Sequence, residues 1–262
     1  MTAPTVIVVP CYNEAARLDT GRFAAFVSGT GATLLCVDDG SKDETARVLE
    51  ELASRSAGRI HVLRLAQNRG KANAVRAGML QAIEGGAGRV GYWDADLATP
   101  LEEIPRFEAV LEAHPGIIGV LGSRVRMLGT RIDRSAARHY MGRVFATIAS
   151  VVLRLAVYDT QCGAKLFRTG RVLRVALEAP FRSRWAFDVE LIARLDRASR
   201  TAGGPPASDL LMELPLLAWR DVGGSKLSVP AMVRATLELL SVRRNAGRDV
   251  QPSTAQVVST SS

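Results

Sequence analysis

Short apolar runs alternate along the first half of the chain with segments whose apolar residues recur at helical spacing. Four of these runs have the length and the flanking turn residues of buried strands: residues 5–9, 33–37, 60–65 and 90–93. Residues 72–83 predict a helix that ends at Gly85-Gly86, and Ser41 with Glu44 has capping-box spacing, which predicts a helix that starts at Ser41. Strands that alternate with helices form parallel sheets. The pattern therefore predicts an α/β fold, with a Rossmann-like, doubly wound, mostly parallel sheet flanked by helices.

The second half of the chain contains longer helical patterns. We expect helices at 101–114, 135–158 and 230–242 and another that opens with residues 185–190, and strands at 117–121 and 211–219 and one that the polar segment 159–167 enters. Residues 247–262 are polar and rich in Ser and Thr, which predicts a disordered tail. We therefore expect a single domain over residues 1–246, with one half over about 1–125 and the other over about 126–246, followed by the tail.

Composition and charge narrow the class of protein. Hydrophobic residues make up 47% of the 262 positions, which is enough to bury a sizeable core. The formal net charge of +8 favours an anionic partner, such as nucleic acid, a negatively charged membrane surface or a phosphorylated small molecule. Three cysteines without a Cys-x-x-Cys pair fit a reducing, cytoplasmic setting. The longest membrane-like stretch, 144–153, is about half of the roughly 20 apolar residues that span a bilayer. We therefore expect no membrane span, and no signal peptide is evident.

Polar residues follow three of the predicted strands at the points where the strands end. Asn13 and Glu14 follow the first strand, Asp38 and Asp39 follow the second, and Asp94 and Asp96 follow the fourth. In an open α/β sheet the carboxyl ends of the strands border the ligand-binding crevice. We expect a phosphate beside Lys71. The side chains expected to hold a base and a ribose are Pro10, Tyr12, Asn13, Glu14 and Asp39.

The pair Asp94 and Asp96 has the chemistry of a metal site. Mg²⁺ commonly takes one or two carboxylates together with phosphate oxygens, so the pair predicts a bound Mg²⁺ or Mn²⁺ that bridges to a diphosphate. Purely structural roles stay open for Asp38, as a helix cap, and for Asn13, as a turn residue. The Gly-rich motifs of P-loop and dinucleotide-binding proteins are absent from the sequence.

Eight motifs along the chain resemble, in order and spacing, those of family 2 glycosyltransferases with the GT-A fold. They are 8–14, 37–41, 68–71, 94–96, 122–124, 159–163, 185–190 and 224–226. The resemblance is narrowest to the group of dolichyl-phosphate (polyprenyl-phosphate) β-glucosyltransferases and mannosyltransferases. Segments 159–163 and 185–190 resemble the glucosyl branch, whereas Leu97 resembles the mannosyl branch.

The resemblance implies roles for individual residues. It implies that Pro10, Tyr12, Glu14 and Asp39 contact the nucleoside, and that Asp94 and Asp96 position a metal ion and the diphosphate. The candidate catalytic residues are Asp96, together with Asp159 and Asp188 as carboxylates that could act as a base. The positions implied around an acceptor phosphate are Arg124, Arg138, Gln161, Arg220, Ser225 and Lys226, with Arg134 or Arg143 as alternatives to Arg138.

The implied reaction is glucosyl transfer from UDP-glucose to a polyprenyl phosphate, with inversion at the anomeric carbon. A phosphate with a second pKa of about 6 is nucleophilic at pH 7 without a strong base, but cations must hold it near the diphosphate. Two alternatives stay open: a GDP-mannose-dependent polyprenyl-phosphate mannosyltransferase, and a soluble family 2 enzyme with a small hydroxyl acceptor. The second would need a general base, Asp159 or Asp188, although Asp188 can instead orient its neighbours at a helix start.

Membrane contact is expected to be peripheral, on the cytoplasmic face. The helical pattern 135–158 starts with basic residues and continues with apolar ones, which suits either an anionic membrane surface or an ordinary core helix. Segment 230–242 has a similar character. Nucleic acid is disfavoured as a partner, because only 5% of residues are aromatic and no stacking motif is present. Formation of a homo-oligomer stays open.

Overall fold

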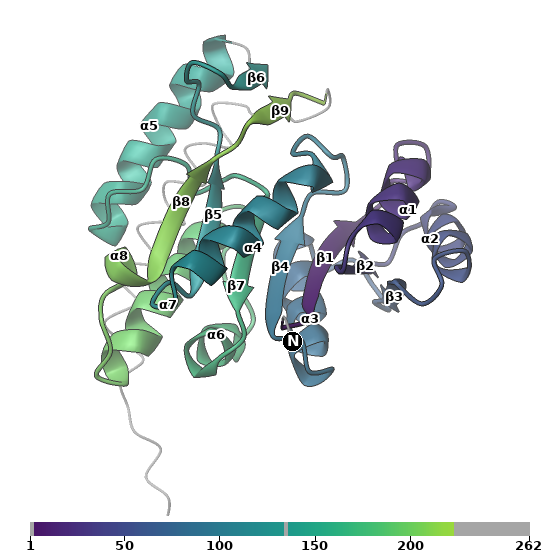
Figure 1. Ribbon diagram of the computed structural model, residues 1–262, viewed down its shortest axis with the longest axis horizontal. Coiled ribbons are helices and arrows are strands. Elements are labelled where there is room, and N and C mark those ends of the chain that lie inside the picture. The colour runs from purple at the N-terminus through teal and green to yellow at the C-terminus, as the bar shows by residue number, and fades with distance from the viewer. Residues whose placement is uncertain (1–2, 134–135, 223–262) are drawn as a thin grey trace, which may run out of the picture.

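The computed structural model describes residues 3–133 and 136–222, without the side chains of 136–141. Within these residues, seven strands form one sheet in the order β3-β2-β1-β4-β7-β5-β8 (Figure 1). Its strands are β1 Thr5–Cys11, β2 Thr33–Asp38, β3 Ile60–Arg64, β4 Arg89–Trp93, β5 Gly119–Ser123, β7 Ala164–Arg168 and β8 Leu211–Pro215. Only β7 runs against its neighbours, so the predicted mostly parallel sheet is confirmed.

Helices cover both faces of the sheet, as the alternating pattern predicts. One face carries α1 Thr20–Gly29, α2 Thr45–Ser54, η1 Leu101–Glu103 and α4 Ile104–Ala113. The other face carries α3 Lys71–Glu84, α6 Arg171–Leu177 and α7 Phe187–Thr201. The remaining elements are β6 Arg131–Asp133, α5 Ala136–Leu153, α8 Ala207–Leu210 and β9 Ala218–Arg220. In Figure 1 the helix α5 lies along one end of the molecule, and its inner side packs on α7.

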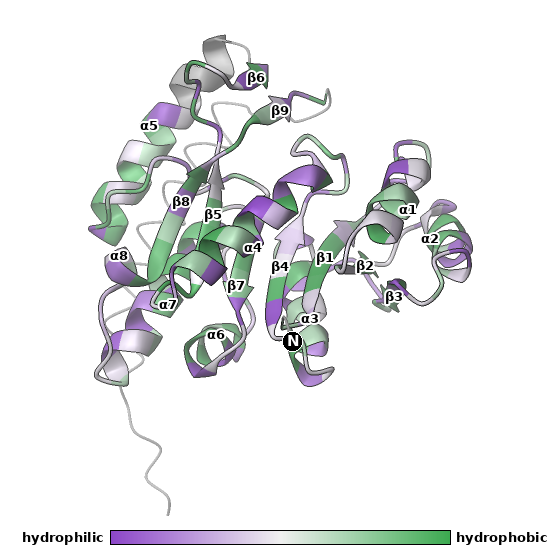
Figure 2. Ribbon diagram, in the orientation of Figure 1, coloured by the Kyte–Doolittle hydropathy of each residue, from purple (hydrophilic) through white to green (hydrophobic). Residues whose placement is uncertain are grey.

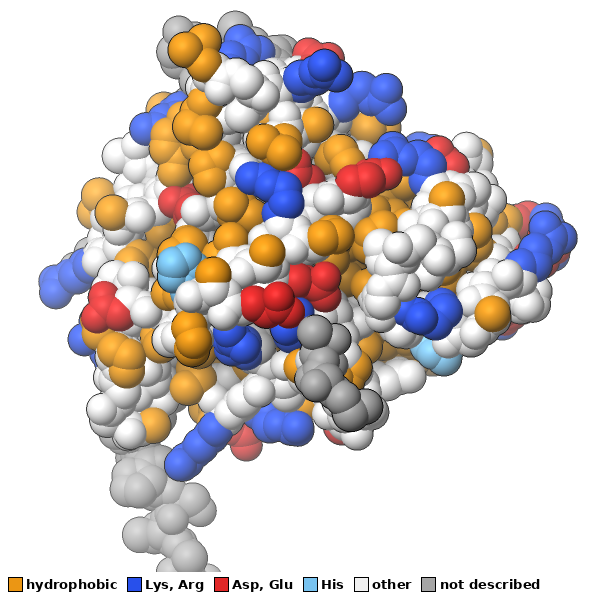
Figure 3. Space-filling view, in the orientation of Figure 1, with side chains coloured by type: hydrophobic (Ala, Val, Ile, Leu, Met, Phe, Trp, Pro, Cys, Tyr) orange, Lys and Arg blue, Asp and Glu red, His pale blue; other side chains and the backbone are white. Residues whose placement is uncertain are grey.

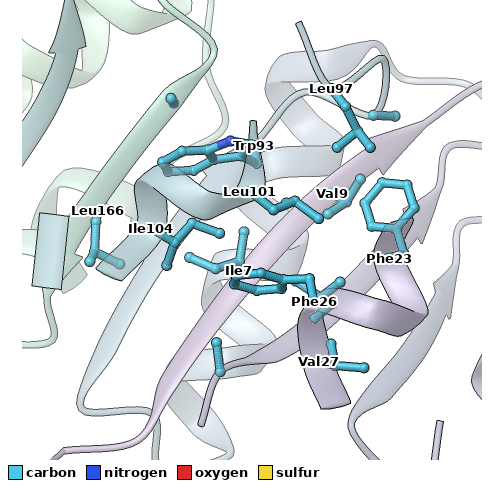
Figure 4. Close-up of a cluster of buried hydrophobic side chains, with 14 of the residues drawn as sticks. Ile7, Val9, Phe23, Phe26, Val27, Trp93, Leu97, Leu101, Ile104 and Leu166 are labelled. Atoms are coloured by element: carbon cyan, nitrogen blue, oxygen red, sulfur yellow. The ribbon is translucent and has the colours of Figure 1, made fainter. Parts of the chain in front are cut away.

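Two apolar cores result, one on each face of the sheet. Successive side chains of a strand point to opposite faces, so Trp93 joins the α1 and α4 side whereas Tyr92 joins the α3 and α7 side. Figure 4 shows the first core, where Phe26 of α1 lies near Ile7 of β1 and Phe23 of α1 lies near Val9 of β1. The hydropathy colouring in Figure 2 shows apolar strands at the centre and polar positions on the outer sides of the helices. This burial holds the strand ends that carry the polar motifs.

The predicted helix start at Ser41 is wrong. The helix α2 begins at Thr45, with Glu44 as its N-cap residue. The Ser41 hydroxyl instead accepts a hydrogen bond from the amide of Asn13, at 3.0 Å. Asp38 accepts from the amide of Ser41 at 2.9 Å, so Asp38 stabilises the turn after β2 rather than capping the helix. A contact between two strand ends thus replaces the local cap.

Two other elements differ from the sequence prediction. The single strand expected at 211–219 is divided into β8 and β9, and β9 leaves the main sheet to pair in parallel with β6. The helix expected to reach Tyr158 ends at Leu153, where Arg154 adopts a left-handed backbone with φ of 52°. The helix predicted at 230–242 and the tail at 247–262 lie outside the described residues.

No described helix combines the length and the apolar character that crossing a bilayer requires.

Candidate active site

The turn after β4 places two carboxylates at the carboxyl edge of the sheet. All five residues of β4 are buried, and the chain turns away directly after Trp93. The amide of Asp94 donates to the carbonyl of Gly163 at 3.0 Å, and the amide of Ala98 donates to Asp96 Oδ1 at 3.0 Å. Leu97, between them, has a left-handed backbone with φ of 52°. The turn therefore has a defined conformation, held by backbone and carboxylate hydrogen bonds.

A pocket of about 330 Å³ opens beside this turn. Its walls come from the ends of β4, β5 and β9, from α5, from the loop that leads into β7 and from the start of α7. Its charged lining residues are Lys71, Asp94, Asp96, Arg124, Arg143, Asp159, Arg184, Asp188 and Asp221. Its aromatic lining residues are Phe145, Tyr158, Trp185, Phe187 and Trp219. The lining of the pocket thus combines charged and aromatic side chains.

Lys71 and the acid pair interact directly. Lys71 Nζ lies 2.5 Å from Asp94 Oδ1. Burial alone lowers the pKa of Lys71, but the nearby negative charges of Asp94 and Asp188 outweigh it and raise the pKa overall. Burial and the charge of Asp94 raise the pKa of Asp96. The positive charges of Lys71 and Arg17 offset this shift only in part, so the site concentrates negative charge.

The acid pair fits a divalent cation. Carboxylate oxygens are ligands of the kind that Mg²⁺ and Mn²⁺ take, and the pKa of Asp96 is raised by burial and then by the charge of Asp94, both of which a bound cation would offset. Among the described residues, no group of three His, Cys, Asp or Glu side chains is arranged to hold a metal. A cation at Asp94 and Asp96 would therefore need further oxygen ligands from a bound molecule.

Asp159 is held by Arg124 in a two-pronged ion pair. Arg124 Nε lies 2.6 Å from Asp159 Oδ2, and Arg124 Nη2 lies 2.8 Å from Asp159 Oδ1. The backbone amide of Arg124 also donates to Asp159 Oδ2. Both side chains are largely buried. Burial lowers the pKa of Arg124, but the Asp159 carboxylate outweighs it and raises the pKa overall. Glu213 accepts hydrogen bonds from the amides of Tyr158 and Asp159 and fixes the start of this loop.

Asp188 lies at the first turn of α7 and also lines the pocket. Its Oδ1 accepts hydrogen bonds from Lys165 Nζ, at 2.6 Å, and from the Tyr92 hydroxyl. Burial and the charge of Asp188 raise the pKa of Tyr92 well above its ordinary value, so the Tyr92 hydroxyl keeps its proton. Asp188 is therefore paired with a cation, as Asp159 is.

The residues predicted to hold the nucleoside lie on the neighbouring strand ends, outside the lining of this pocket. Tyr12 is 39% exposed, and Asn13 adopts φ of 53° and accepts from the amide of Lys42. The Glu14 carboxylate pairs with Arg17 at 2.6 Å. Pro10, in β1, pairs with Val37 of β2.

Asp39 and Arg17 connect these strand ends to the pocket. Asp39 is buried, and its two oxygens accept from the amides of Arg69, at 2.9 Å, and Gly70, at 2.7 Å. It therefore shapes the loop that presents Lys71. The hydrogen bond and charge of Glu14 raise the pKa of Arg17, and the charge of Asp96 adds to this shift, so acids on both strand ends act on Arg17. Nothing in the sequence pattern singled out Arg17.

The residues predicted around an acceptor phosphate are only partly brought together. Arg124 and Gln161 line the pocket, and Gln161 Nε2 is buried without a hydrogen-bond partner among the described residues. Arg220 is exposed on β9, whose neighbours Trp219 and Asp221 line the pocket instead. Arg138 lies in α5, but its side chain is outside the description, and Ser225 and Lys226 lie outside the described residues.

Two cations of the pocket were not among the chosen site residues. Arg143 lies over the ring of Tyr158, with 3.9 Å from its guanidinium carbon to the ring centroid. Arg184 lies near Gly70, at the start of α3. Arg143 was an alternative to Arg138 in the sequence pattern, whereas Arg184 directly precedes a motif and carried no signal of its own.

Comparisons with known proteins identify the family and the fold. The family description "Glycosyl transferase family 2" matches residues 6–172. The chain is 33% identical over 242 residues to a dolichyl-phosphate beta-glucosyltransferase of Drosophila melanogaster, covering 85% of this chain and 68% of that protein. It is 25% identical over 193 residues to a polyprenol monophosphomannose synthase of Mycolicibacterium smegmatis, covering 74% of this chain and 72% of the relative.

The fold is also similar to that of a solved enzyme. The crystal structure of glucosyl-3-phosphoglycerate synthase from Mycobacterium tuberculosis, with Mn²⁺, UDP and glucosyl-3-phosphoglycerate, superimposes with a TM-score of 0.67. The match covers 92% of this chain and 80% of that one, at 19% sequence identity, and supports the GT-A fold. Together with the family match over more than half of the sequence, these findings show that the chain belongs to glycosyl transferase family 2.

Proposed function

We propose that the protein transfers glucose from UDP-glucose to a polyprenyl phosphate, with inversion at the anomeric carbon. An acceptor phosphate oxygen attacks the anomeric carbon, and the bond from that carbon to the diphosphate oxygen breaks with its electron pair leaving on UDP. The similarity to dolichyl-phosphate beta-glucosyltransferases supports this choice of donor and acceptor. One feature of the pocket supports it independently.

The observation that carries the proposal is the pairing of both candidate bases. Asp159 is held at both oxygens by Arg124, and Asp188 is bound by Lys165. A carboxylate in a close ion pair is a weaker proton acceptor, because the neighbouring positive charge stabilises its ionised form. A neutral hydroxyl acceptor needs a general base, whereas a phosphate is already ionised at pH 7. The pairing therefore favours a phosphate acceptor over a hydroxyl acceptor.

The cations of the pocket suit such an acceptor. Arg143 and Arg184 line the pocket together with Arg124, and arginine forms two-pronged contacts with phosphate oxygens. The buried Nε2 of Gln161 is a further donor without a partner among the described residues. Two anionic substrates must approach each other during the transfer, and these cations reduce their repulsion. Arg138, Arg220, Ser225 and Lys226 remain proposed acceptor residues.

For the donor, we propose that Pro10, Tyr12, Asn13, Glu14 and Asp39 hold the nucleoside and that Lys71 contacts the diphosphate. Asp94 and Asp96 would hold a divalent cation, Mg²⁺ or Mn²⁺, which as a Lewis acid stabilises negative charge on the departing diphosphate. Asp94 is already aligned by its backbone hydrogen bond to Gly163, and Asp96 by its contact with the amide of Ala98. Lys71 forms an ion pair with Asp94, so its ammonium group lies beside the proposed position of the diphosphate.

We also propose that α5 faces an anionic membrane surface. Val144, Thr147 and Val151 form an exposed stripe along the helix, with Arg143 and Arg154 at its ends. Apolar side chains flanked by arginines suit the boundary of an anionic leaflet, where each basic residue contributes about 1 kcal/mol. Figure 3 shows basic and apolar side chains interspersed on the visible face. The opposite side of α5 packs on α7, next to the pocket.

The test of the proposed function is a donor and acceptor screen. The full chain is incubated with UDP-glucose, other UDP-hexoses or GDP-mannose, with a short polyprenyl phosphate, 3-phosphoglycerate or a neutral sugar, and with Mg²⁺ or Mn²⁺. We expect a glucosylated lipid phosphate and free UDP. We expect the Asp96→Asn variant to lose at least 100-fold in rate. Transfer to neutral sugars in place of lipid phosphate would overturn the acceptor, and transfer from GDP-mannose alone would overturn the donor.

A further inference from the structure

A lysine is fully buried beneath the pocket. Lys165 lies in β7, and the antiparallel pairing of β4 with β7 places it directly opposite Tyr92. Directly opposed residues on paired strands project to the same face of the sheet, and here that face is covered by the start of α7. Burying an ammonium group is costly unless it is paired and hydrogen-bonded. The fold therefore has to supply Lys165 with partners.

Asp188 is the partner that α7 supplies. Lys165 Nζ donates to Asp188 Oδ1 and to the carbonyl of Cys162, each at 2.6 Å. The Tyr92 hydroxyl donates to the same Asp188 oxygen. Both donors thus reach Oδ1, and Oδ2 receives no hydrogen bond within the described part of the chain. Two strands, β4 and β7, thus hold this carboxylate of α7 by one of its two oxygens.

The place of Asp188 indicates what Oδ2 can bind. Asp188 lines the pocket, and its charge acts on Lys71, the side chain that pairs with Asp94. It is therefore next to the acid pair where the proposed diphosphate is bound. A second phosphate would be repelled by a carboxylate, whereas a neutral hydroxyl donates to one readily. The part of a nucleotide sugar that is adjacent to the diphosphate and rich in hydroxyl groups is the hexose.

We propose that Asp188 accepts a hydrogen bond from a hydroxyl group of the donor hexose, and that Lys165 and Tyr92 are positioning residues that orient its carboxylate. This inference rests on the proposed function, since it requires a nucleotide-sugar donor. A hydrogen bond from a neutral group to a carboxylate changes affinity by roughly 10- to 100-fold. The contribution is specific to the sugar, so the affinity for the nucleotide alone does not include it.

The test compares two affinities for each variant of the full chain, measured by calorimetry with Mn²⁺ present. One is the dissociation constant (Kd) for UDP and the other is the Kd for UDP-glucose. We expect Asp188→Asn to raise the Kd for UDP-glucose at least tenfold and to change the Kd for UDP by less than twofold. Tyr92→Phe keeps the Lys165 pair and the ring, so it should fold, and we expect a threefold or greater loss for UDP-glucose only. The double variant, Tyr92→Phe with Asp188→Asn, should lose no more affinity for UDP-glucose than Asp188→Asn alone does.

A buried hydroxyl on another part of the fold supplies the control. Ser56 is hydrogen-bonded to Ile60 and Ala53, far along the sheet, so Ser56→Ala should lower stability and leave both Kd values unchanged. Deoxy analogues of UDP-glucose then identify the hydroxyl: the analogue that lacks it should bind wild type and Asp188→Asn equally.

The outcomes separate the two proposals. If Asp188→Asn binds UDP-glucose as tightly as the wild type does, this inference fails while the proposed function stands. The same holds if the losses of affinity for UDP-glucose in the two single variants add fully in the double variant. If UDP-glucose does not bind but another nucleotide hexose does, the donor assignment fails and the same ratio is measured with that donor. If the wild type binds no nucleotide hexose, the proposed function fails and this inference fails with it.

Discussion

The carboxylate of Asp94 lies directly over the α-carbon of Gly163. The amide of Asp94 donates to the carbonyl of Gly163 at 3.0 Å, and a β-carbon on Gly163 would lie 2.0 Å from Asp94 Oδ2. Real β-carbons do not come so close to a heavy atom. A side chain at this position would have to displace the Asp94 carboxylate, so glycine allows the loop before β7 to pass under the turn that carries the acid pair.

We predict that Gly163→Ala displaces the Asp94 carboxylate and lowers the transfer rate about 100-fold, the cost of a misplacement of about 1 Å. Gly116→Ala is the matched control, because a β-carbon there meets no atom within 4 Å. Steady-state rates and thermal unfolding of both variants provide the measurement. Full activity of Gly163→Ala would show that the position of Asp94 is not critical.

The Arg124–Asp159 pair predicts strong energetic coupling. Removing one partner leaves the other charge buried and unpaired, so Arg124→Met and Asp159→Asn should each cost about 3–5 kcal/mol of unfolding free energy. The double variant removes both charges, so its loss should be smaller than the sum of the two single losses. Urea unfolding of the four proteins measures this cycle. Simple additivity would contradict the close pairing.

Glu213 predicts a dependence of stability on pH. Burial raises the pKa of Glu213, so the native state binds its proton more tightly than the unfolded state does. The contribution of this group to stability is therefore greatest below its unfolded pKa and declines as pH rises through the raised native pKa. Glu213→Gln carries no titrating group and should not show this decline.

The measurement is urea unfolding at several pH values between about 4 and 7, which is the range in which carboxylates with an ordinary or a raised pKa titrate. Relative to Glu213→Gln, the wild type should lose stability as pH rises from 4 to 7. Glu84→Gln, at an exposed position at the end of α3, should follow the wild type at every pH. A constant difference between wild type and Glu213→Gln would contradict the raised pKa.

The exposed stripe of α5 predicts binding to anionic vesicles. Val144 is 53% exposed and Val151 is 64% exposed, so Val144→Glu with Val151→Glu should preserve the fold while adding negative charge at the proposed membrane surface. We expect sedimentation with phosphatidylserine vesicles to fall severalfold, and wild-type binding to weaken with salt. Val175→Glu, on α6, is the control at a comparably exposed valine. Equal binding of all three proteins would remove α5 from the membrane contact.

Local sequence patterns were sufficient for most elements of the sheet. Buried strands require continuous apolar runs and helices require an apolar stripe, so β1, β2, β3 and β4 and the helix α3 were predicted nearly to the residue. The prediction failed where a distant contact replaced a local one. Ser41 carries a capping-box pattern, but its hydroxyl binds the amide of Asn13 instead of starting a helix. Such a contact depends on two neighbouring strand ends and leaves no local signal.

By itself, the sequence determined the α/β class, the motifs of the family and the edge of the sheet where acids gather, because these follow from periodicity and from residue type at strand ends. Only the tertiary structure decided how those charges are used. It pairs Asp159 with Arg124, brings Lys165 beneath Asp188 through the reversed strand β7, and places in the pocket both Arg184 and Arg143, which was only one of several alternatives in the sequence. A side chain's charge is written in the sequence, but its partners depend on which strands and helices pack together, and that is fixed by the burial of the whole core.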